Sequence, residues 1–366
     1  MNIPKKLLFA ITPSLALLTC GELGTRAAGA PDCSPIQPQT GAWETMMGDP
    51  ELLWKLEPNR RFETGNDVTQ INAVGLRDSL LPSTGKLPNE IRILVTGDSS
   101  IYGWGVRDNE TYAVFLEQNL RRHFRRPIEV INLGVPGYST EQTLRLLDQI
   151  GWSYEPDLVI VSNIFSDCNI DAFQDKQALA LTNPETSSVY SALKSSRLYC
   201  SIYMPWAQYQ ANLNQDTNRV LMPGIPTGPN AAVTLEKLSA HLALSRVPIP
   251  DYLDNLKKIK IQAQKRNASM LLAPLAQEWD VGIWNVPMPK PSADHVLPWQ
   301  PYREAQKEWA ATENIDIVSF PEVFSQYNGQ KAKLFVDNMH PSKYGTALMA
   351  EAVSKHIIAN PTLLGL

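Results

Sequence analysis

From residue 91 onward, short apolar runs alternate with longer stretches of helical periodicity. The run at residues 91–96 reads IRILVT, and such a mostly apolar, β-branched segment is typical of a buried strand. Further strands are predicted at residues 128–133, 157–162, 269–273 and 315–319, with helices between them, for example at 111–122 and 140–150, and an amphipathic helix at the end of the chain. This alternation predicts an α/β fold, in which helices cover both faces of a five-stranded parallel sheet.

The first thirty residues have the build of an export signal. Lys5 and Lys6 precede an uncharged, mostly apolar stretch at residues 7–20, and small residues follow at 28–30. At about 1.5 Å per residue this stretch measures roughly 20 Å, which is short for a membrane span. We therefore predict an exported protein that is periplasmic, secreted or anchored to the cell envelope. An uncleaved anchor, which would attach the protein to a membrane, is the alternative reading of residues 1–30.

Composition excludes some partners and predicts no cofactor. Lysine and arginine total 33 against 37 acidic residues, a net charge of −4, so the chain lacks the basic character of nucleic-acid-binding domains. The four cysteines form no zinc-binding pattern, and we expect neither a metal nor another cofactor. In an oxidising compartment, Cys168 and Cys200 could form a disulfide, which would leave Cys33 without a partner after signal cleavage; buried free thiols are the alternative.

Four short polar blocks stand out between Ile91 and the C-terminus. They are GDS at 97–99, NLGVPGY at 132–138, SNIFSD at 162–167 and DNMH at 337–340. The first three directly follow predicted strands, and the carboxyl ends of parallel strands are where α/β folds place their sites. Each block alone could be an ordinary turn or helix cap.

Together and in this order, the four blocks resemble those of the SGNH (GDSL-type) hydrolases, a family of serine esterases and lipases. The resemblance runs from about residue 91 to the end of the chain and implies a three-layer, flavodoxin-like fold. It also implies that Ser99 is the nucleophile and that Asp337 and His340 complete a catalytic triad. The backbone N–H groups of Ser99 and Gly134 would form the oxyanion hole. The chain lacks a G-x-S-x-G elbow, which argues against the α/β-hydrolase fold.

The third block departs from the family pattern. At the family spacing Ser166 stands where an asparagine is expected, and Asn163 comes three residues too early. A serine hydroxyl can also donate to an oxyanion, although its arm is shorter, so Ser166 is the third predicted donor. Asp98 and Asp167 are predicted to support the first and third blocks.

Two regions lie outside the predicted common core. Residues 31–90 are predicted to form an N-terminal extension. Its NAVGLRD stretch resembles a segment found before the catalytic domain in exported bacterial members of the family. Within this stretch, we expect Arg77 to form an ion pair rather than to clamp an anion.

Residues 169–250 are too long for a simple connection and are predicted to form an inserted cap within a hydrolase domain spanning 91–366. The cap contains Tyr199, Tyr203, Trp206 and Tyr209, for which core packing is the expected role and a sugar groove the alternative.

The chemistry of these residues makes hydrolysis of an O-acyl ester, on a small molecule or a polysaccharide, the leading functional hypothesis. A histidine can remove the serine proton during attack, and a carboxylate three positions earlier can hold the imidazole ring. Two alternatives stay open. One is an acyltransferase that uses the same triad to acylate an envelope sugar, and the other is a non-catalytic binding member of the same fold.

Overall fold

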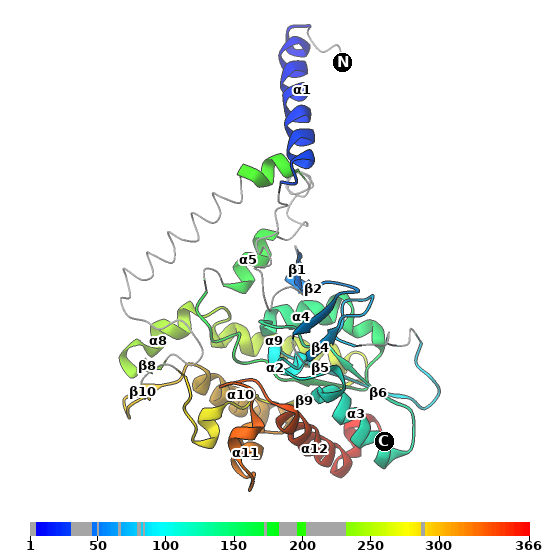
Figure 1. Cartoon of the computed structure of the whole chain (residues 1–366), viewed down its shortest axis with the longest axis vertical. Coiled ribbons are helices and arrows are strands. Elements are labelled where there is room, and N and C mark those ends of the chain that lie inside the picture. Colours follow the sequence, from blue (N-terminus) through cyan, green and yellow to red (C-terminus); the bar gives the residue numbers. More distant parts are fainter. Residues whose placement is uncertain are drawn as a thin grey trace.

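The computed structural model describes residues 5–30, 46–49, 51–64, 67–78, 82, 85–171, 174–182, 196–202, 232–286 and 290–366. In Figure 1 a body of mixed sheet and helices occupies the lower part of the molecule, and one long helix projects from it. Residues 203–231, which include Tyr203, Trp206 and Tyr209 of the predicted cap, lie outside the described residues.

The core is one five-stranded sheet in the order β11-β9-β7-β5-β6, with every pair of neighbours parallel. Its strands are β5 (Ile91–Thr96), β6 (Ile128–Asn132), β7 (Leu158–Val161), β9 (Ser269–Leu272) and β11 (Asp316–Ile317). All residues of β5 and β7 are buried, as their mostly apolar sequences predict, and the buried residues of β5 include Arg92. Numbered along the chain, the order is 2-1-3-4-5, which is that of flavodoxin-like folds. The predicted fold class is confirmed.

Helices cover both faces of this sheet. The helices α3 (Tyr112–Phe124) and α12 (Lys343–Ala359) pack against each other, and α4 (Thr140–Gln149) packs on α9 (Ile249–Gln264) as a second pair. In α12 the residues Met349, Ala350, Val353 and Ile357 are all buried, as the amphipathic pattern predicts. The remaining helices of this part are α2 (Ser99–Tyr102), α10 (Trp299–Glu313) and α11 (Phe320–Ser325). The helices α3 and α12 therefore share a layer (Figure 1).

The N-terminal extension forms two antiparallel hairpins that lie on the α/β unit. Strands β1 (Met46–Asp49) and β2 (Leu53–Leu56) make the first, and β3 (Arg61–Thr64) and β4 (Asp67–Gln70) make the second. Arg77, in the following turn, pairs with Asp108 at 3.0 Å and donates to the carbonyl oxygens of Tyr102, Gly103 and Val106. The predicted ion pair of Arg77 is thus present, and it braces the loop after α2.

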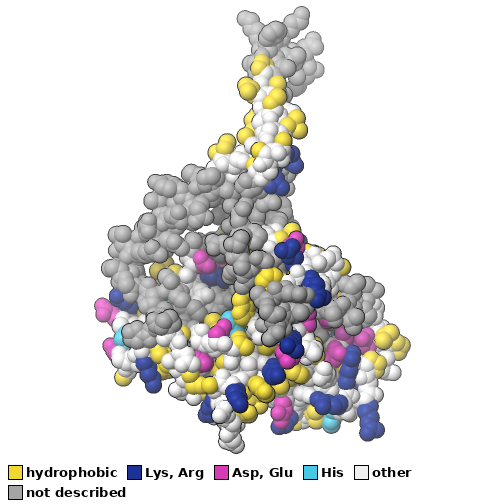
Figure 2. All heavy atoms as spheres, viewed as in Figure 1, with side chains coloured by type: hydrophobic (Ala, Val, Ile, Leu, Met, Phe, Trp, Pro, Cys, Tyr) yellow, Lys and Arg dark blue, Asp and Glu magenta, His cyan; other side chains and the backbone are white. Residues whose placement is uncertain are grey.

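Residues 5–27 form the helix α1 (Lys5–Ala27), which stands away from the body (Figure 1). Apolar side chains including Leu17, Leu18 and Leu23 are exposed along it, and Figure 2 shows hydrophobic groups over much of its length. In the part of the chain that the structure describes, no helix is both long enough and apolar enough to cross a membrane.

The region between β7 and α9 contains α5 (Asp175–Thr182), β8 (Val233–Thr234) and α8 (Leu235–Leu244). β8 pairs with β10 (His295–Val296), far along the chain. The start and end of this region are joined at its base, because the N–H of Arg246 donates to Asn169 O at 2.7 Å and the N–H of Asp175 donates to Arg246 O at 2.9 Å. The two ends of this region therefore lie side by side.

The predicted disulfide between Cys168 and Cys200 is wrong. Cys200 is disulfide-bonded, whereas Cys168 is free and fully buried. Cys168 directly follows the third block in the core, where its thiol donates to Phe165 O at 3.3 Å. The alternative of a small buried thiol therefore holds for Cys168, and Cys33 lies outside the described residues.

Candidate active site

Three of the predicted residues meet in a continuous chain of hydrogen bonds. The Oγ of Ser99 lies 2.7 Å from Nε2 of His340, and Nδ1 of His340 lies 2.7 Å from Oδ2 of Asp337. Ser99 and His340 are 241 positions apart in the sequence, and the end of β5 and the turn before α12 bring them together. The imidazole ring therefore lies between a hydroxyl and a carboxylate, which is the arrangement that activates a serine.

The DNMH block is a tight turn that Asp337 organises itself. Its Oδ1 accepts the N–H of Met339 at 2.9 Å and the N–H of His340 at 2.8 Å, which leaves Oδ2 for the imidazole ring. Partial burial pushes the pKa of Asp337 upward, but the hydrogen bonds from the His340 ring and from the two N–H groups outweigh it, so this pKa lies below its usual value. The carboxylate stays ionised at any pH where a neutral imidazole can act as a base.

Ser99 is the first residue of α2, and Asp98 caps this short helix. The Asp98 carboxylate accepts the N–H of Ser100 at 3.0 Å, and Asp98 is almost completely buried. Burial raises the pKa of Asp98 to about 6, against the opposing effects of that hydrogen bond and of the nearby His340. Asp98 thus caps the short helix that begins with Ser99.

Trp104 was not among the predicted site residues, yet it stacks on His340. The two rings are 5.7 Å apart between centroids with an interplanar angle of 27°, and the N–H of Trp104 donates to Ser99 O at 3.0 Å. The loop that Arg77 braces from the N-terminal extension is the one that carries Trp104. One side of the imidazole ring is therefore fixed by an aromatic neighbour.

The second block does not offer Gly134 as an oxyanion donor. Its N–H donates to the Oδ1 of Asn132 at 2.9 Å, and the residue is buried. A Cβ at this position would lie 2.3 Å from the backbone nitrogen of Tyr102, so glycine is required here for the close approach of the loop to α2. The prediction for Gly134 is at odds with this geometry, because the donor that it needs is already used.

Gly137, in the same block, has the properties that Gly134 lacks. It is half-buried rather than buried, and its N–H makes no hydrogen bond to any of the described residues. Its φ of +76° lies in the left-handed region, which favours glycine. The pattern NLGVPG contains two glycines, and only the packing of the loop distinguishes them.

The third block places its polar side chains in different surroundings. The hydroxyl of Ser166 makes no hydrogen bond to any residue that the structure describes. Asn163 is fully buried and used in packing, since it donates to Tyr138 O at 3.0 Å and accepts from the Thr143 hydroxyl. Of the two residues, Asn163 is held in place by two hydrogen bonds, whereas the Ser166 hydroxyl makes none to the described residues.

Asp167 joins the third block to the start of α4. Its Oδ1 accepts the N–H and the hydroxyl of Thr140, at 2.9 and 2.6 Å, whereas its Oδ2 is buried without a hydrogen-bond partner among the described residues. Burial raises the pKa of Asp167 to about 7, although the bonds from Thr140 act in the opposite direction. Asp167 thus connects the third block to Thr140, and its burial carries an energetic cost when the carboxyl group is ionised.

This burial makes a pH-dependent prediction. Between the unfolded pKa of about 4 and the folded pKa of about 7, the folded protein binds a proton that the unfolded chain has lost, so the contribution of Asp167 to stability falls as pH rises through this window. Asp167→Asn should remove this dependence and raise the melting temperature more at pH 8 than at pH 5. Asp254→Asn, at an exposed position, is the matched control. An equal shift at both pH values for Asp167→Asn would contradict the argument.

In the part of the chain that the structure describes, no three His, Cys, Asp or Glu side chains are grouped so that they could hold a metal ion.

Comparison with known families identifies the class of protein. The profile of the GDSL-like lipase/acylhydrolase family matches residues 95–348, which is more than half of the chain and includes all four blocks. The chain therefore belongs to the GDSL-like lipase/acylhydrolase family. It is an enzyme of the carboxylic ester hydrolase class.

Solved structures with some similarity have low sequence identity. A G-D-S-L family lipolytic protein from Desulfitobacterium hafniense has 16% sequence identity and a TM-score of 0.42, and the match covers 72% of this chain and 98% of that protein. A lipase/acylhydrolase from Enterococcus faecalis has 13% identity and a TM-score of 0.43, with 74% and 96% covered. The acetyl xylan esterase AlAXEase has 14% identity and a TM-score of 0.44, with 73% and 100% covered. No curated protein sequence matched the chain.

Proposed function

We propose that the protein is a serine esterase in which Ser99 attacks the carbonyl carbon of an O-acyl ester. The observation that carries this proposal is the unbroken chain of two 2.7 Å contacts from Ser99 through His340 to Asp337. His340 is the base, and Asp337 holds the proton on Nδ1, so that Nε2 faces the serine as an acceptor.

The reaction has two halves. In the first, Nε2 of His340 takes the proton from Ser99 as its Oγ bonds to the carbonyl carbon, and the resulting imidazolium then gives that proton to the departing alcohol. In the second, a water molecule loses a proton to His340 and attacks the acyl-serine, which releases the carboxylic acid and restores Ser99. Asp337 stays ionised throughout and stabilises the imidazolium.

We propose that the oxyanion hole consists of the backbone N–H groups of Ser99 and Gly137 and the hydroxyl of Ser166. The Gly137 N–H and the Ser166 hydroxyl have no hydrogen-bond partner among the described residues. The loops that carry Gly137 and Ser99 are joined, because the N–H of Val135 donates to Gly97 O. This replaces Gly134, whose N–H is bound to Asn132. Donors that are in place before the reaction stabilise the developing charge without reorganisation.

The role of Ser166 is tested by Ser166→Ala. If the hydroxyl donates only to the oxyanion, kcat should fall by about tenfold or more with little change in KM, which is the signature of an interaction made in the transition state. The melting temperature should stay the same, because no hydrogen bond in the free protein is lost. An unchanged kcat with a lowered melting temperature would instead make Ser166 a structural residue of the turn.

We further propose that the substrate is an O-acyl ester of a small molecule or a polysaccharide, and that the protein is exported through its N-terminal segment. The first part is supported by the family, and the second by Lys5, Lys6 and the apolar stretch that follows them. Purified residues 31–366 should release p-nitrophenol from p-nitrophenyl esters of graded chain length. Release that requires an added sugar acceptor would indicate acyl transfer, and no turnover of any ester would contradict the proposal.

A further inference from the structure

Gly137 is flanked by two backbone carbonyl groups, and each of them accepts a hydrogen bond from a side chain outside the four blocks. The indole Nε1 of Trp54, in strand β2, donates to Pro136 O at 2.9 Å. The guanidinium Nη1 of Arg246, which follows α8, donates to Gly137 O at 2.8 Å. Trp54 comes from the N-terminal extension and Arg246 from the end of the cap region, so neither belongs to a block that the sequence singled out.

The first of these hydrogen bonds fixes the direction of the Gly137 N–H. A trans peptide is planar, and its C=O and N–H groups point in opposite directions. The described chain contains no cis peptide bond. Because Trp54 binds the C=O of Pro136, it sets the plane of the unit, and the N–H of Gly137 must point away from the indole. The same bond polarises the peptide, which makes the N–H a better donor.

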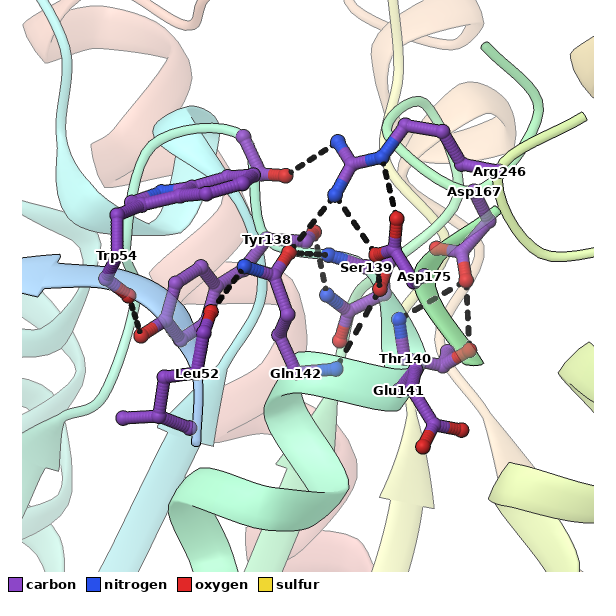
Figure 3. Close-up of polar contacts among 12 residues, drawn as sticks. Leu52, Trp54, Tyr138, Ser139, Thr140, Glu141, Gln142, Asp167, Asp175 and Arg246 are labelled. Atoms are coloured by element: carbon purple, nitrogen blue, oxygen red, sulfur yellow. Dashed lines mark hydrogen bonds and ion pairs between the residues drawn. The ribbon is translucent and has the colours of Figure 1, made fainter. Parts of the chain in front are cut away.

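The second hydrogen bond holds the other end of Gly137, and Arg246 is itself fixed. Figure 3 shows its guanidinium bound by Asp175 and Gln142: Nε and Nη2 donate to the Asp175 carboxylate at 2.8 and 2.7 Å, and Nη2 also donates to Gln142 at 2.8 Å. Arg246 is 4% exposed and Asp175 is fully buried. The Arg246 guanidinium also lies 5.2 Å from the centre of the Trp54 ring, so the two clamping side chains contact each other.

A glycine with a positive φ needs such external support. With no side chain, Gly137 can adopt several backbone conformations at little energetic difference, and a donor that rotates away is lost to the oxyanion. A buried arginine–aspartate pair is a poor source of net stability, because desolvation offsets most of its attraction. Its hydrogen bond to Gly137 O gives this pair a function.

We propose that Trp54 and Arg246 are positioning residues that clamp the carbonyl groups on either side of Gly137 and thereby aim its N–H at the oxyanion of the transition state. The inference rests on the proposed role of Gly137. It extends the catalytic machinery to the N-terminal extension and to the base of the cap.

The kinetic test is Trp54→Phe, which keeps an aromatic ring but removes the Nε1 donor. We expect kcat on a p-nitrophenyl ester to fall by about tenfold with KM within about twofold of its original value, because the donor acts in the transition state. Arg246→Lys keeps a positive charge beside Asp175 but loses the planar guanidinium group with its several N–H donors. This variant should lower kcat in the same way. The double variant should lose less than the product of the single losses, since the two residues hold the same glycine through the peptide units on its two sides.

Trp152→Phe is the matched control. Its Nε1 donates to Gln262 at 2.6 Å, so the same substitution removes an indole hydrogen bond from a residue outside the site. The control should lose stability with no loss of kcat. If Trp54→Phe keeps full kcat, or if it loses no more than Trp152→Phe, the clamp is overturned even though the esterase itself is active.

A spectroscopic test works even if no ester is turned over. Only two Pro-Gly pairs occur in the chain, at 136–137 and 223–224, so labelling with ¹³C-proline and ¹⁵N-glycine gives two correlated carbonyl–amide signals. Trp54→Phe should shift one of the two signals and leave the other in place, whereas Trp152→Phe should move neither. Unchanged signals in Trp54→Phe would refute the hydrogen bond to Pro136, independently of the fate of the proposed function.

Discussion

Replacing Ser99 with alanine is expected to lower kcat on a p-nitrophenyl ester by at least about 10³-fold, because the variant keeps the binding site but has no atom that can form the acyl-enzyme. The Oγ of Ser99 has one described contact, the 2.7 Å hydrogen bond to His340, so its loss should leave the fold and the melting temperature almost unchanged. Initial rates and thermal melts on the same preparation measure both quantities.

Ser100→Ala is the control for this experiment. Ser100 is the next residue, is buried, and its hydroxyl has no hydrogen-bond partner among the described residues, so the same substitution there should leave kcat unchanged. If Ser99→Ala kept more than a few per cent of the activity, the nucleophile would have to be another residue.

Replacing His340 with alanine is expected to be nearly as severe. Without the imidazole, no base lies within hydrogen-bond distance of Ser99 Oγ among the described residues, and the leaving alcohol has no proton donor. We expect kcat to fall by about 10³-fold or more. The remaining rate should increase with pH, because hydroxide in solution can act in place of the missing base. A profile of kcat against pH measures this change.

His295→Ala provides a matched control for the histidine. His295 also contacts an aspartate, Asp294, at 3.0 Å, but it begins strand β10, which pairs with β8 and is not part of the core sheet. Its replacement should not affect kcat. Comparable losses in both variants would mean that the Asp337–His340 pair has a structural role rather than a catalytic one.

The strands at the centre of the fold could be predicted from the sequence, because a strand that is buried on both faces is a short, mostly apolar run of residues. The strands β5, β6 and β7 were predicted to within a residue or two at each end, since parallel strands under helices are mostly apolar. β11 is two residues long, whereas five were predicted. The contact between Asp337 and His340 could be expected from the sequence, since the two residues are close along the chain and form their own turn.

The second block could not be resolved from its sequence. Gly134 and Gly137 are both glycines in one loop, and only the tertiary structure shows that the N–H of Gly134 is bound by Asn132 while that of Gly137 is not. Trp54 and Arg246 carry no local motif, because their contacts to the loop span 82 and 109 positions. The predicted Cys168–Cys200 pairing was wrong for the same reason, since spacing along the chain does not show which cysteines meet in the folded protein.

The central claim, that Ser99 is the nucleophile of an ester hydrolase, is tested most directly by trapping it. The protein should be treated with diethyl p-nitrophenyl phosphate, which transfers a diethylphosphoryl group to an activated serine and releases p-nitrophenol. Intact mass and peptide mapping should then show one adduct per chain, located on Ser99, and none in Ser99→Ala. An adduct on another residue, or no adduct on a protein that hydrolyses esters, would contradict the account.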